Sequence, residues 1–149
     1  MRSFRILPPR RERRESGTSV IELSLLFPWI FFLFVGAFDM GFFTYSLISV
    51  ENAARVAAEY TSKSSTVAAD TSGACTKVLA ELAMLPNMGG VTVCTASPLT
   101  VQASSITGPD GNPATSVSVT YSGNNLVPIP GLLMGKLNVT RIVQMRVTP

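Results

Sequence analysis

A long stretch without formal charge near the N-terminus limits the folds open to this chain more than any other feature. Residues 23–50 contain one charged side chain, Asp39, and Glu22 stands immediately before the stretch. As an α-helix the stretch would be about 42 Å long, whereas the hydrocarbon core of a bilayer is about 30 Å thick. The pattern therefore predicts one helix that crosses a membrane.

The charges around this helix predict its orientation. Residues 1–16 hold six Arg and two Glu, a net charge of +4, while residues 17–149 hold six basic and seven acidic side chains, a net charge of −1. Because basic segments resist translocation, the N-terminus should stay in the cytoplasm and the chain after residue 50 should face outward. The basic tail contains Pro and adjoins a membrane segment, so it indicates topology rather than binding to nucleic acid.

Two common N-terminal devices are alternatives to a helix that is processed and retained. A secretory signal peptide has an apolar core of about 7 to 15 residues followed by a small-residue cleavage site. Here the apolar run is longer, and large side chains such as Phe42 and Phe43 continue beyond it, which disfavours removal of the helix. An uncleaved single-pass anchor is the simple alternative, and the sequence leaves it open.

The junction between the basic tail and the apolar helix has a specific pattern. Gly17 is followed by Thr18, three further uncharged residues and then Glu22. This pattern resembles the processing site of type IV prepilins and pseudopilins, which a membrane-embedded prepilin peptidase cuts after the Gly. The resemblance implies cleavage between Gly17 and Thr18, with Glu22 as the fifth residue of the mature chain and the apolar helix retained.

Glu22 has two interpretations in this setting. A carboxylate at the edge of hydrocarbon is costly unless it is paired, and cleavage would create a positive α-amino group on Thr18 of a neighbouring subunit. Pairing of the two groups would orient an incoming subunit in a helical filament. Alternatively, Ser19 and Glu22 form a capping box, in which the Glu satisfies a free backbone amide at the start of the helix.

A longer resemblance extends over residues 14–60. The Arg-rich leader, the sequence GTSVIE, Pro28, an acidic residue beside a Gly at 39–41, and ENAARVAAEY at 51–60 are together similar to the TadE-like family. Members of that family are minor pseudopilins of the bacterial tight-adherence (Tad, type IVc) pilus systems, which act in adhesion. The resemblance implies a place in the cytoplasmic membrane with a periplasmic domain, a prepilin peptidase and other pilins as partners, and a part in initiating the pilus or in its tip or base complex.

The sequence leaves two other function classes open beside this one. The first is a single-pass protein whose exported domain binds a partner at the cell surface and is never processed as a pilin. The second is a pseudopilin of a type II secretion-like system. Processing after Gly17 separates the first of these from the family interpretation.

Three residues in the long helix have roles that the sequence leaves open. Pro28 removes a backbone hydrogen bond and is expected to kink the helix. Asp39 lies about 25 Å along the helix from Glu22, so it marks either the outer membrane boundary or a buried pairing site. Arg55 shares this boundary or pairing assignment, and it also follows Glu51 at the spacing of a surface ion pair.

Beyond the membrane the sequence predicts an α+β domain. We divide the chain into a leader at 1–17, a transmembrane and extended helix at 18–62, and a periplasmic domain at 63–149. Small side chains at Val50, Ala53, Ala54, Ala57 and Ala58 form a helix face for packing, most simply against a sheet. In the domain we expect a linker at 61–72, a second helix at 74–85, and an antiparallel sheet of about three or four strands at 91–95, 99–103, 115–121 and 137–147. A turn at 108–113 and an irregular connection at 127–131 separate the later strands.

The chemistry-bearing residues of the domain are few. Cys75, at the start of the second helix, and Cys94, in the strand after it, are expected to form a disulfide in an oxidising periplasm, the alternative being two buried thiols. Two Cys without any His do not make a closed metal site, so we expect no metal or other cofactor. The absence of His also removes the commonest general base, and the sequence predicts a non-enzyme with no catalytic residues.

Overall fold

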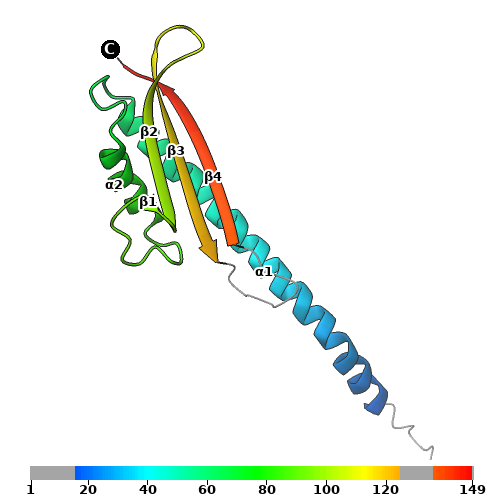
Figure 1. Cartoon of the computed structure of the whole chain (residues 1–149). Helices are drawn as coiled ribbons and strands as arrows, with labels where there is room; N and C mark the ends of the chain where they lie inside the picture. The colour runs from blue at the N-terminus through cyan, green and yellow to red at the C-terminus, as the bar shows by residue number, and fades with distance from the viewer. Residues whose placement is uncertain (1–15, 125–135, 149) are drawn as a thin grey trace, which may run out of the picture. The chain divides into compact units, whose positions relative to one another are not determined.

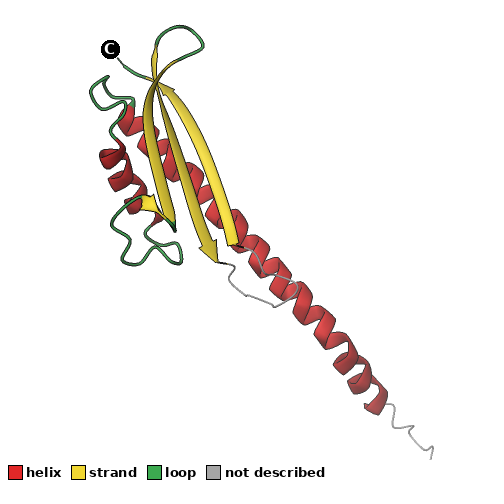
Figure 2. Cartoon of the chain, viewed as in Figure 1, coloured by secondary structure: helices red, strands yellow, loops and turns green. Residues whose placement is uncertain are grey.

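The computed structural model describes residues 16–124 and 136–148, which form two helices and four strands. The helices are α1 (Ser16–Thr61) and α2 (Thr71–Leu82), and the strands are β1 (Thr95–Ala96), β2 (Leu99–Thr107), β3 (Pro113–Asn124) and β4 (Lys136–Arg146) (Figures 1 and 2). The predicted α+β class is confirmed. Residues 1–15 of the predicted leader and the whole predicted connection at 127–131 lie outside the described residues.

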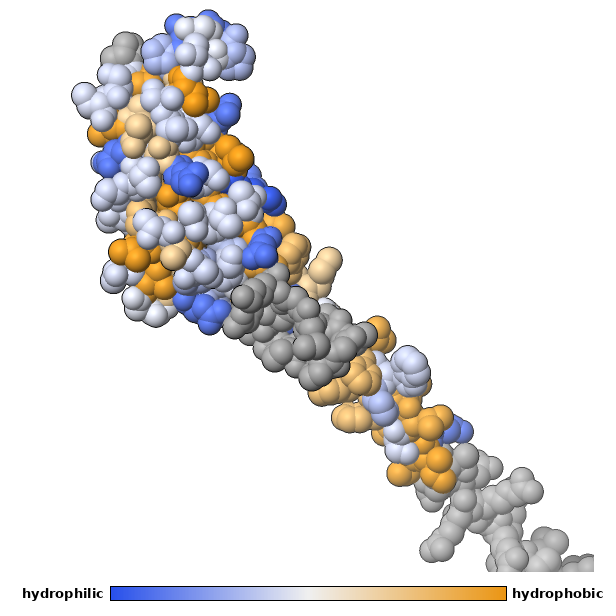
Figure 3. All heavy atoms as spheres, in the orientation of Figure 1, coloured by the Kyte–Doolittle hydropathy of each residue, from blue (hydrophilic) through white to orange (hydrophobic). Residues whose placement is uncertain are grey.

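The chain divides into two compact units, Met1–Gly36 and Ala37–Pro149. Within the first, the described part is helical from Ser16 onward, and α1 continues through Pro28. Nearly all of its large apolar side chains are exposed, as the hydrophobic colouring of this part of α1 in Figure 3 shows. A helix that is apolar around its circumference needs either a protein core or a lipid environment to cover it.

The sheet of the second unit is fully antiparallel, with the strand order β1-β2-β3-β4. Its register places Val119 of β3 between Val101 of β2 and Arg141 of β4, and Tyr121 between Leu99 and Val139. Because side chains alternate along a strand, these residues lie on one face of the sheet, and the hydroxyl and amide side chains between them lie on the other. This confirms that three of the predicted segments are strands: 99–103, 115–121 and 137–147. The observed strands β2, β3 and β4 begin and end at other residues than those predicted.

The predicted strand at 91–95 is wrong, because only Thr95–Ala96 pairs with β2. Further along the free edge of β2, the Thr71 hydroxyl at the start of α2 accepts a hydrogen bond from the Ala103 N–H at 3.2 Å. This contact occupies the edge that a longer first strand would need. Residues 91–94 therefore lie outside the sheet, and Cys94 precedes β1 instead of lying in a strand.

The second helix starts earlier and ends earlier than the predicted range of 74–85. Asp70 caps its N-terminus by accepting a hydrogen bond from the Gly73 N–H at 3.0 Å, so Thr71 and Ser72 belong to the helix and not to the predicted linker. At the other end, helix α2 stops at Leu82 and the chain turns, with the Leu85 N–H bonded to the Leu82 carbonyl. Cys75 accordingly lies inside the helix.

The core of the second unit lies between the two helices and one face of the sheet. All five small residues of the predicted α1 face are fully buried in it (Val50, Ala53, Ala54, Ala57 and Ala58). Helix α2 contributes Ala74, Val78 and Leu82, and the sheet contributes the inward residues of β2, β3 and β4. The small side chains of α1 allow the helix to approach its neighbours closely, which confirms that this face packs within the chain.

Candidate functional site

The candidate site begins at the junction between leader and helix. Helix α1 already includes Ser16, so Ser19 lies within its first turns and cannot be its N-cap. The capping-box interpretation of Ser19 and Glu22 is therefore wrong for this form of the chain. The Glu22 side chain is exposed on the helix surface. It lies beside apolar residues that are also exposed, Ile21 at 69% and Leu23 at 63%.

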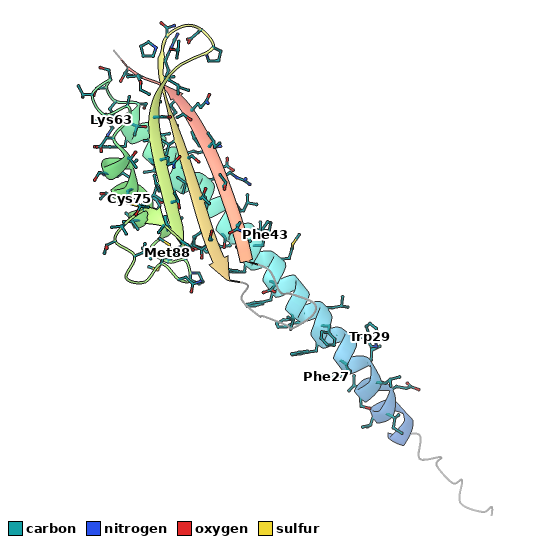
Figure 4. All side chains as sticks on the ribbon, viewed as in Figure 1. Phe27, Trp29, Phe43, Lys63, Cys75 and Met88 are labelled. Carbon is teal, nitrogen blue, oxygen red and sulfur yellow. A yellow bond between two sulfur atoms is a disulfide. The ribbon has the colours of Figure 1, made fainter. Side chains whose placement is uncertain are left out.

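The rest of the described first unit is an uncharged apolar surface. Phe27 and Trp29 are 63% and 72% exposed, and Figure 4 shows their side chains standing out from the helix. Among the described residues, α1 is the one helix that is long and apolar enough to cross a membrane, from Ser19 to Thr61. Glu22 is thus the single formal charge of the unit from Ser16 to Gly36, at the edge of a surface suited to lipid or to other apolar helices.

In the second unit, α1 has a further acidic residue whose surroundings differ from those of Glu22. Asp39 is partly buried and takes part in an interaction. A shallow apolar groove lies on the same stretch of helix, lined by Ala37, Phe38, Gly41, Phe42 and Tyr45. The assignment of Asp39 to the outer membrane boundary or to a pairing site stays a prediction.

Arg55 is placed by a surface ion pair within α1. Its guanidinium donates to Glu51 Oε1 at 3.0 Å, as the spacing of the two residues predicts. Arg141 of β4 approaches the other oxygen of the same carboxylate, with 3.8 Å between Nε and Oε2. Local sequence patterns do not predict this contact, although one signal is present: Arg141 interrupts an otherwise apolar series on the inner face of β4.

A second polar contact that local sequence patterns do not predict joins the end of α1 to the start of α2. The Tyr60 hydroxyl donates to Asp70 Oδ2 at 2.8 Å, while Asp70 Oδ1 accepts from the Gly73 N–H. These hydrogen bonds, first that from Gly73 and then that from Tyr60, lower the pKa of Asp70 below its ordinary value. Gly73 leaves room for the Tyr60 ring, which a Cβ at this position would overlap. An Asp three residues before a Gly in a polar segment was the available signal.

The far end of α1 is fixed to the sheet by hydroxyl groups. Thr115 Oγ1 of β3 lies 2.9 Å from Thr61 Oγ1 and 2.8 Å from the Ala68 carbonyl oxygen, and all of these groups are buried from solvent. The Thr148 N–H near the C-terminus donates to the Ser62 carbonyl at 2.9 Å. This end of the helix and the sheet thus form one structural unit.

Cys75 and Cys94 are bonded as a disulfide, with 5.8 Å between their Cα atoms. The bond links α2 to the segment before β1, and Figure 4 labels Cys75 at this position. Within residues 16–124 and 136–148, no cluster of three or more His, Cys, Asp or Glu side chains is arranged to hold a metal ion.

Comparison with known proteins supports the resemblance of the N-terminal helix to the TadE-like family. Residues 17–59 match the family model described as TadE-like protein. The comparison with curated proteins and that with solved structures each found no match. The matched segment contains Gly17, Glu22 and Arg55 and ends two residues before α1 does. Over residues 17–59, within its N-terminal helix, the chain is thus similar to the TadE-like family.

Proposed function

We propose that this chain is a minor pseudopilin of a Tad-type (type IVc) pilus system. A prepilin peptidase cuts it between Gly17 and Thr18, and the processed subunit joins other pilins and pseudopilins to initiate the pilus or to form its tip or base complex. The observation that carries this proposal is the 46-residue helix α1, which matches the TadE-like family over residues 17–59. Its exposed apolar part between Ser16 and Gly36 has Glu22 as its one charge.

The second unit supports a role in assembly outside the cytoplasm. It is a folded domain with a disulfide, and disulfides persist in oxidising compartments such as the bacterial periplasm. Together with a membrane-capable helix near the N-terminus, this supports a protein anchored in the cytoplasmic membrane with its domain outside. We infer a structural and non-enzymatic role.

Glu22 has a defined task in this proposal. In the membrane its carboxylate is exposed at the apolar surface of α1, where an unpaired charge is costly. The α-amino group that cleavage creates on Thr18 of a neighbouring subunit supplies a positive partner. Formation of this pair between subunits sets the axial position at which an incoming helix stops.

Processing is tested by the intact mass of the chain extracted from membranes of cells that contain the prepilin peptidase. We expect the mass of residues 18–149, and we expect Gly17→Leu to leave the full-length mass. Gly36→Leu is the matched control, because a Cβ at Gly36 meets no atom within 4 Å and the cut is remote from it. A full-length mass for the unaltered chain would overturn the proposal and favour an unprocessed membrane anchor.

The docking role of Glu22 is tested separately by crosslinking in cells that make fibres. Glu22→Ala should keep the processed mass but lose crosslinks to other pilins along α1. Glu59→Ala removes another exposed acidic residue of the same helix and should retain these crosslinks. If Glu22→Ala assembles as the unaltered chain does, the pairing role is wrong, whereas processing after Gly17 still stands.

A further inference from the structure

The two edges of the sheet differ in what lies beside them. At the β2 edge, β1 pairs with the start of β2, and the Thr71 hydroxyl accepts a hydrogen bond from the Ala103 N–H. At the other edge, β4 is the last strand in the order, as Figure 1 shows. Within residues 16–124 and 136–148, no strand pairs with the outer side of β4. Strand β4 thus has an open edge of 11 residues.

The direction of the backbone groups of β4 follows from one hydrogen bond just beyond the strand. The Val147 N–H donates to the Pro113 carbonyl at 3.0 Å, so the backbone groups of these two residues face each other. In an antiparallel pair, the N–H and C=O groups of successive residues point alternately toward the partner strand and away from it. The odd-numbered residues of β4 therefore bond to β3, and the even-numbered residues point their backbone groups to the open edge. One outward carbonyl, that of Thr140, accepts from the Arg141 guanidinium at 3.0 Å.

Strand β4 is regular along its whole length. Its register with β3 is continuous from Lys136, opposite Asn124, to Arg146. The strand contains neither Pro nor Gly. A regular edge keeps its outward N–H and C=O groups in one line, and Pro or a bulge is a common way to prevent another strand from pairing there. The backbone of β4 is therefore suited to accept an additional strand.

The side chains of β4 indicate what kind of strand fits beside it. Basic residues stand at both ends and near the middle (Lys136, Arg146 and Arg141), and the strand contains no acidic residue. The Arg146 side chain pairs with Asp110 and remains 65% exposed. Between the two ends, the even-numbered residues are uncharged, and one of them, Ile142, is 64% exposed on the outer face of the sheet. The edge thus combines an apolar centre with basic ends.

We propose that the open edge of β4 binds an extended segment of another protein as an additional antiparallel strand, and that this segment has an acidic residue near each end. Pairing of the two backbones supplies the main contact, as is general for the addition of a strand to a sheet edge. An apolar side chain opposite Ile142 covers that residue, and carboxylates opposite Lys136 and Arg146 complement their charges. The inference requires neither processing after Gly17 nor the membrane anchor.

A second copy of β4 fits this edge less well than an acidic segment does. It would bring three further basic residues and no acidic residue to the interface. Like charges on neighbouring strands repel one another, whereas opposite charges stabilise the pair. Charge complementarity therefore favours an acidic partner, and self-association at β4 is an outcome that the test must separate from it.

The test uses a fluorescent peptide of 11 residues, the length of β4. It has Glu at both ends, Val at the fifth position, which lies opposite Ile142, and Thr elsewhere. A second peptide has Lys in place of both Glu. Two further forms of the first peptide carry N-methyl groups, either at the third, fifth and seventh amides, which face β4, or at the fourth, sixth and eighth, which face away. Fluorescence anisotropy measures binding to the full chain in detergent.

We expect the Glu peptide to bind and the Lys peptide to bind several-fold more weakly. Methyl groups on the amides that face β4 should weaken binding about tenfold or more, because three backbone hydrogen bonds are lost. Methyl groups on the other amides should have little effect. Absence of binding by the Glu peptide, or an equal loss for the two methylated forms, would overturn the added strand. Equal binding of the Glu and Lys peptides would overturn the acidic partner.

A pair of variants tests the same edge from the side of the protein. Gln144→Pro removes one outward N–H, whereas Gln144→Ala keeps it and is the matched control, since Gln144 is exposed. Only the Pro variant should lose binding, and near-UV circular dichroism checks that it is folded. If it is not, the methylated peptides decide alone. Sedimentation of the chain without peptide completes the test: a dimer that Gln144→Pro dissociates would assign the edge to a second copy and overturn the proposal.

Discussion

Arg141 in β4 and Glu51 in α1 approach each other across the edge of the domain, with 3.8 Å between Nε and Oε2. Their side chains remain 36% and 41% exposed, so solvent screens the attraction. Glu51 also accepts a hydrogen bond from Arg55. The register places Arg141 beside Val119 on the inner face of the sheet, so the contact explains why a charge interrupts the apolar series of β4.

Arg141→Met should change the free energy of unfolding by no more than about 1 kcal/mol, because an exposed ion pair contributes little and Met continues the apolar series. Val117→Ala, which truncates a fully buried neighbour, should cost about 1.5 to 3 kcal/mol. Thermal unfolding of the detergent-solubilised chain, followed by near-UV circular dichroism, compares the two. An equal loss in both variants would show that Arg141 has a larger structural role than its exposure indicates.

Gly73→Ala should lower the Tm although Ala favours a helix over Gly by about 1 kcal/mol. The added Cβ overlaps the Tyr60 ring and the Asp70 carboxylate, so the hydrogen bond between them must break or the helices must separate. Ser72→Ala is the neighbouring control, because Ser72 is exposed, and its Tm should be unchanged or slightly higher. A Tm for Gly73→Ala above that of the unaltered chain would contradict the packing described for Tyr60.

Acid should remove the contribution of Asp70 to stability. Its pKa is lowered in the folded chain, so the contribution is fully present above the unfolded pKa of about 3.9 and is lost as the pH falls through the lower folded pKa. Asp70→Asn removes this titration, so its stability should depend less on pH below about 4. Urea unfolding at a series of acidic pH values measures the difference. Parallel pH profiles for the two proteins would rule out the role of the Asp70 carboxylate.

Loss of the disulfide should destabilise the second unit by about 3 kcal/mol, since the bond closes a loop of about 20 residues. The matched comparison is Cys75→Ala with Cys94→Ala, measured with and without reductant. Reductant should lower the Tm of the unaltered chain toward that of the double variant and leave the double variant unchanged. A reductant effect on the double variant would trace the loss of stability to something other than this bond.

The parts of the fold that the sequence predicts well are those with a regular pattern. The apolar run predicts α1, the alternation of Val117, Val119 and Tyr121 predicts a half-buried strand, and the two Cys predict the disulfide. The prediction of a strand at 91–95 is wrong although its residues include several that are β-branched. Thr71 already forms a hydrogen bond with the edge of β2 that this strand would need. Such competition between segments far apart in the chain leaves no local pattern.

Some features of the candidate site likewise follow from local sequence patterns, and others depend on tertiary contacts. The match over residues 17–59 follows a local motif, and the spacing of Glu51 and Arg55 predicts their pair. The partner of Arg141 and the ring that requires Gly73 depend on tertiary contacts. A lone charge in an apolar strand and an Asp before a helix were visible signals, but neither identifies its partner without the fold.

The alanine stripe of α1 has a geometric consequence for any helix of another chain that would pack against α1. Ala53, Ala54, Ala57 and Ala58 are completely shielded by the chain's own sheet and second helix. A foreign helix at this height can approach only the opposite side, where Glu51, Arg55 and Glu59 project. We expect lateral association there to be polar and sensitive to ionic strength. Nearer the N-terminus we expect it to be apolar and insensitive to salt.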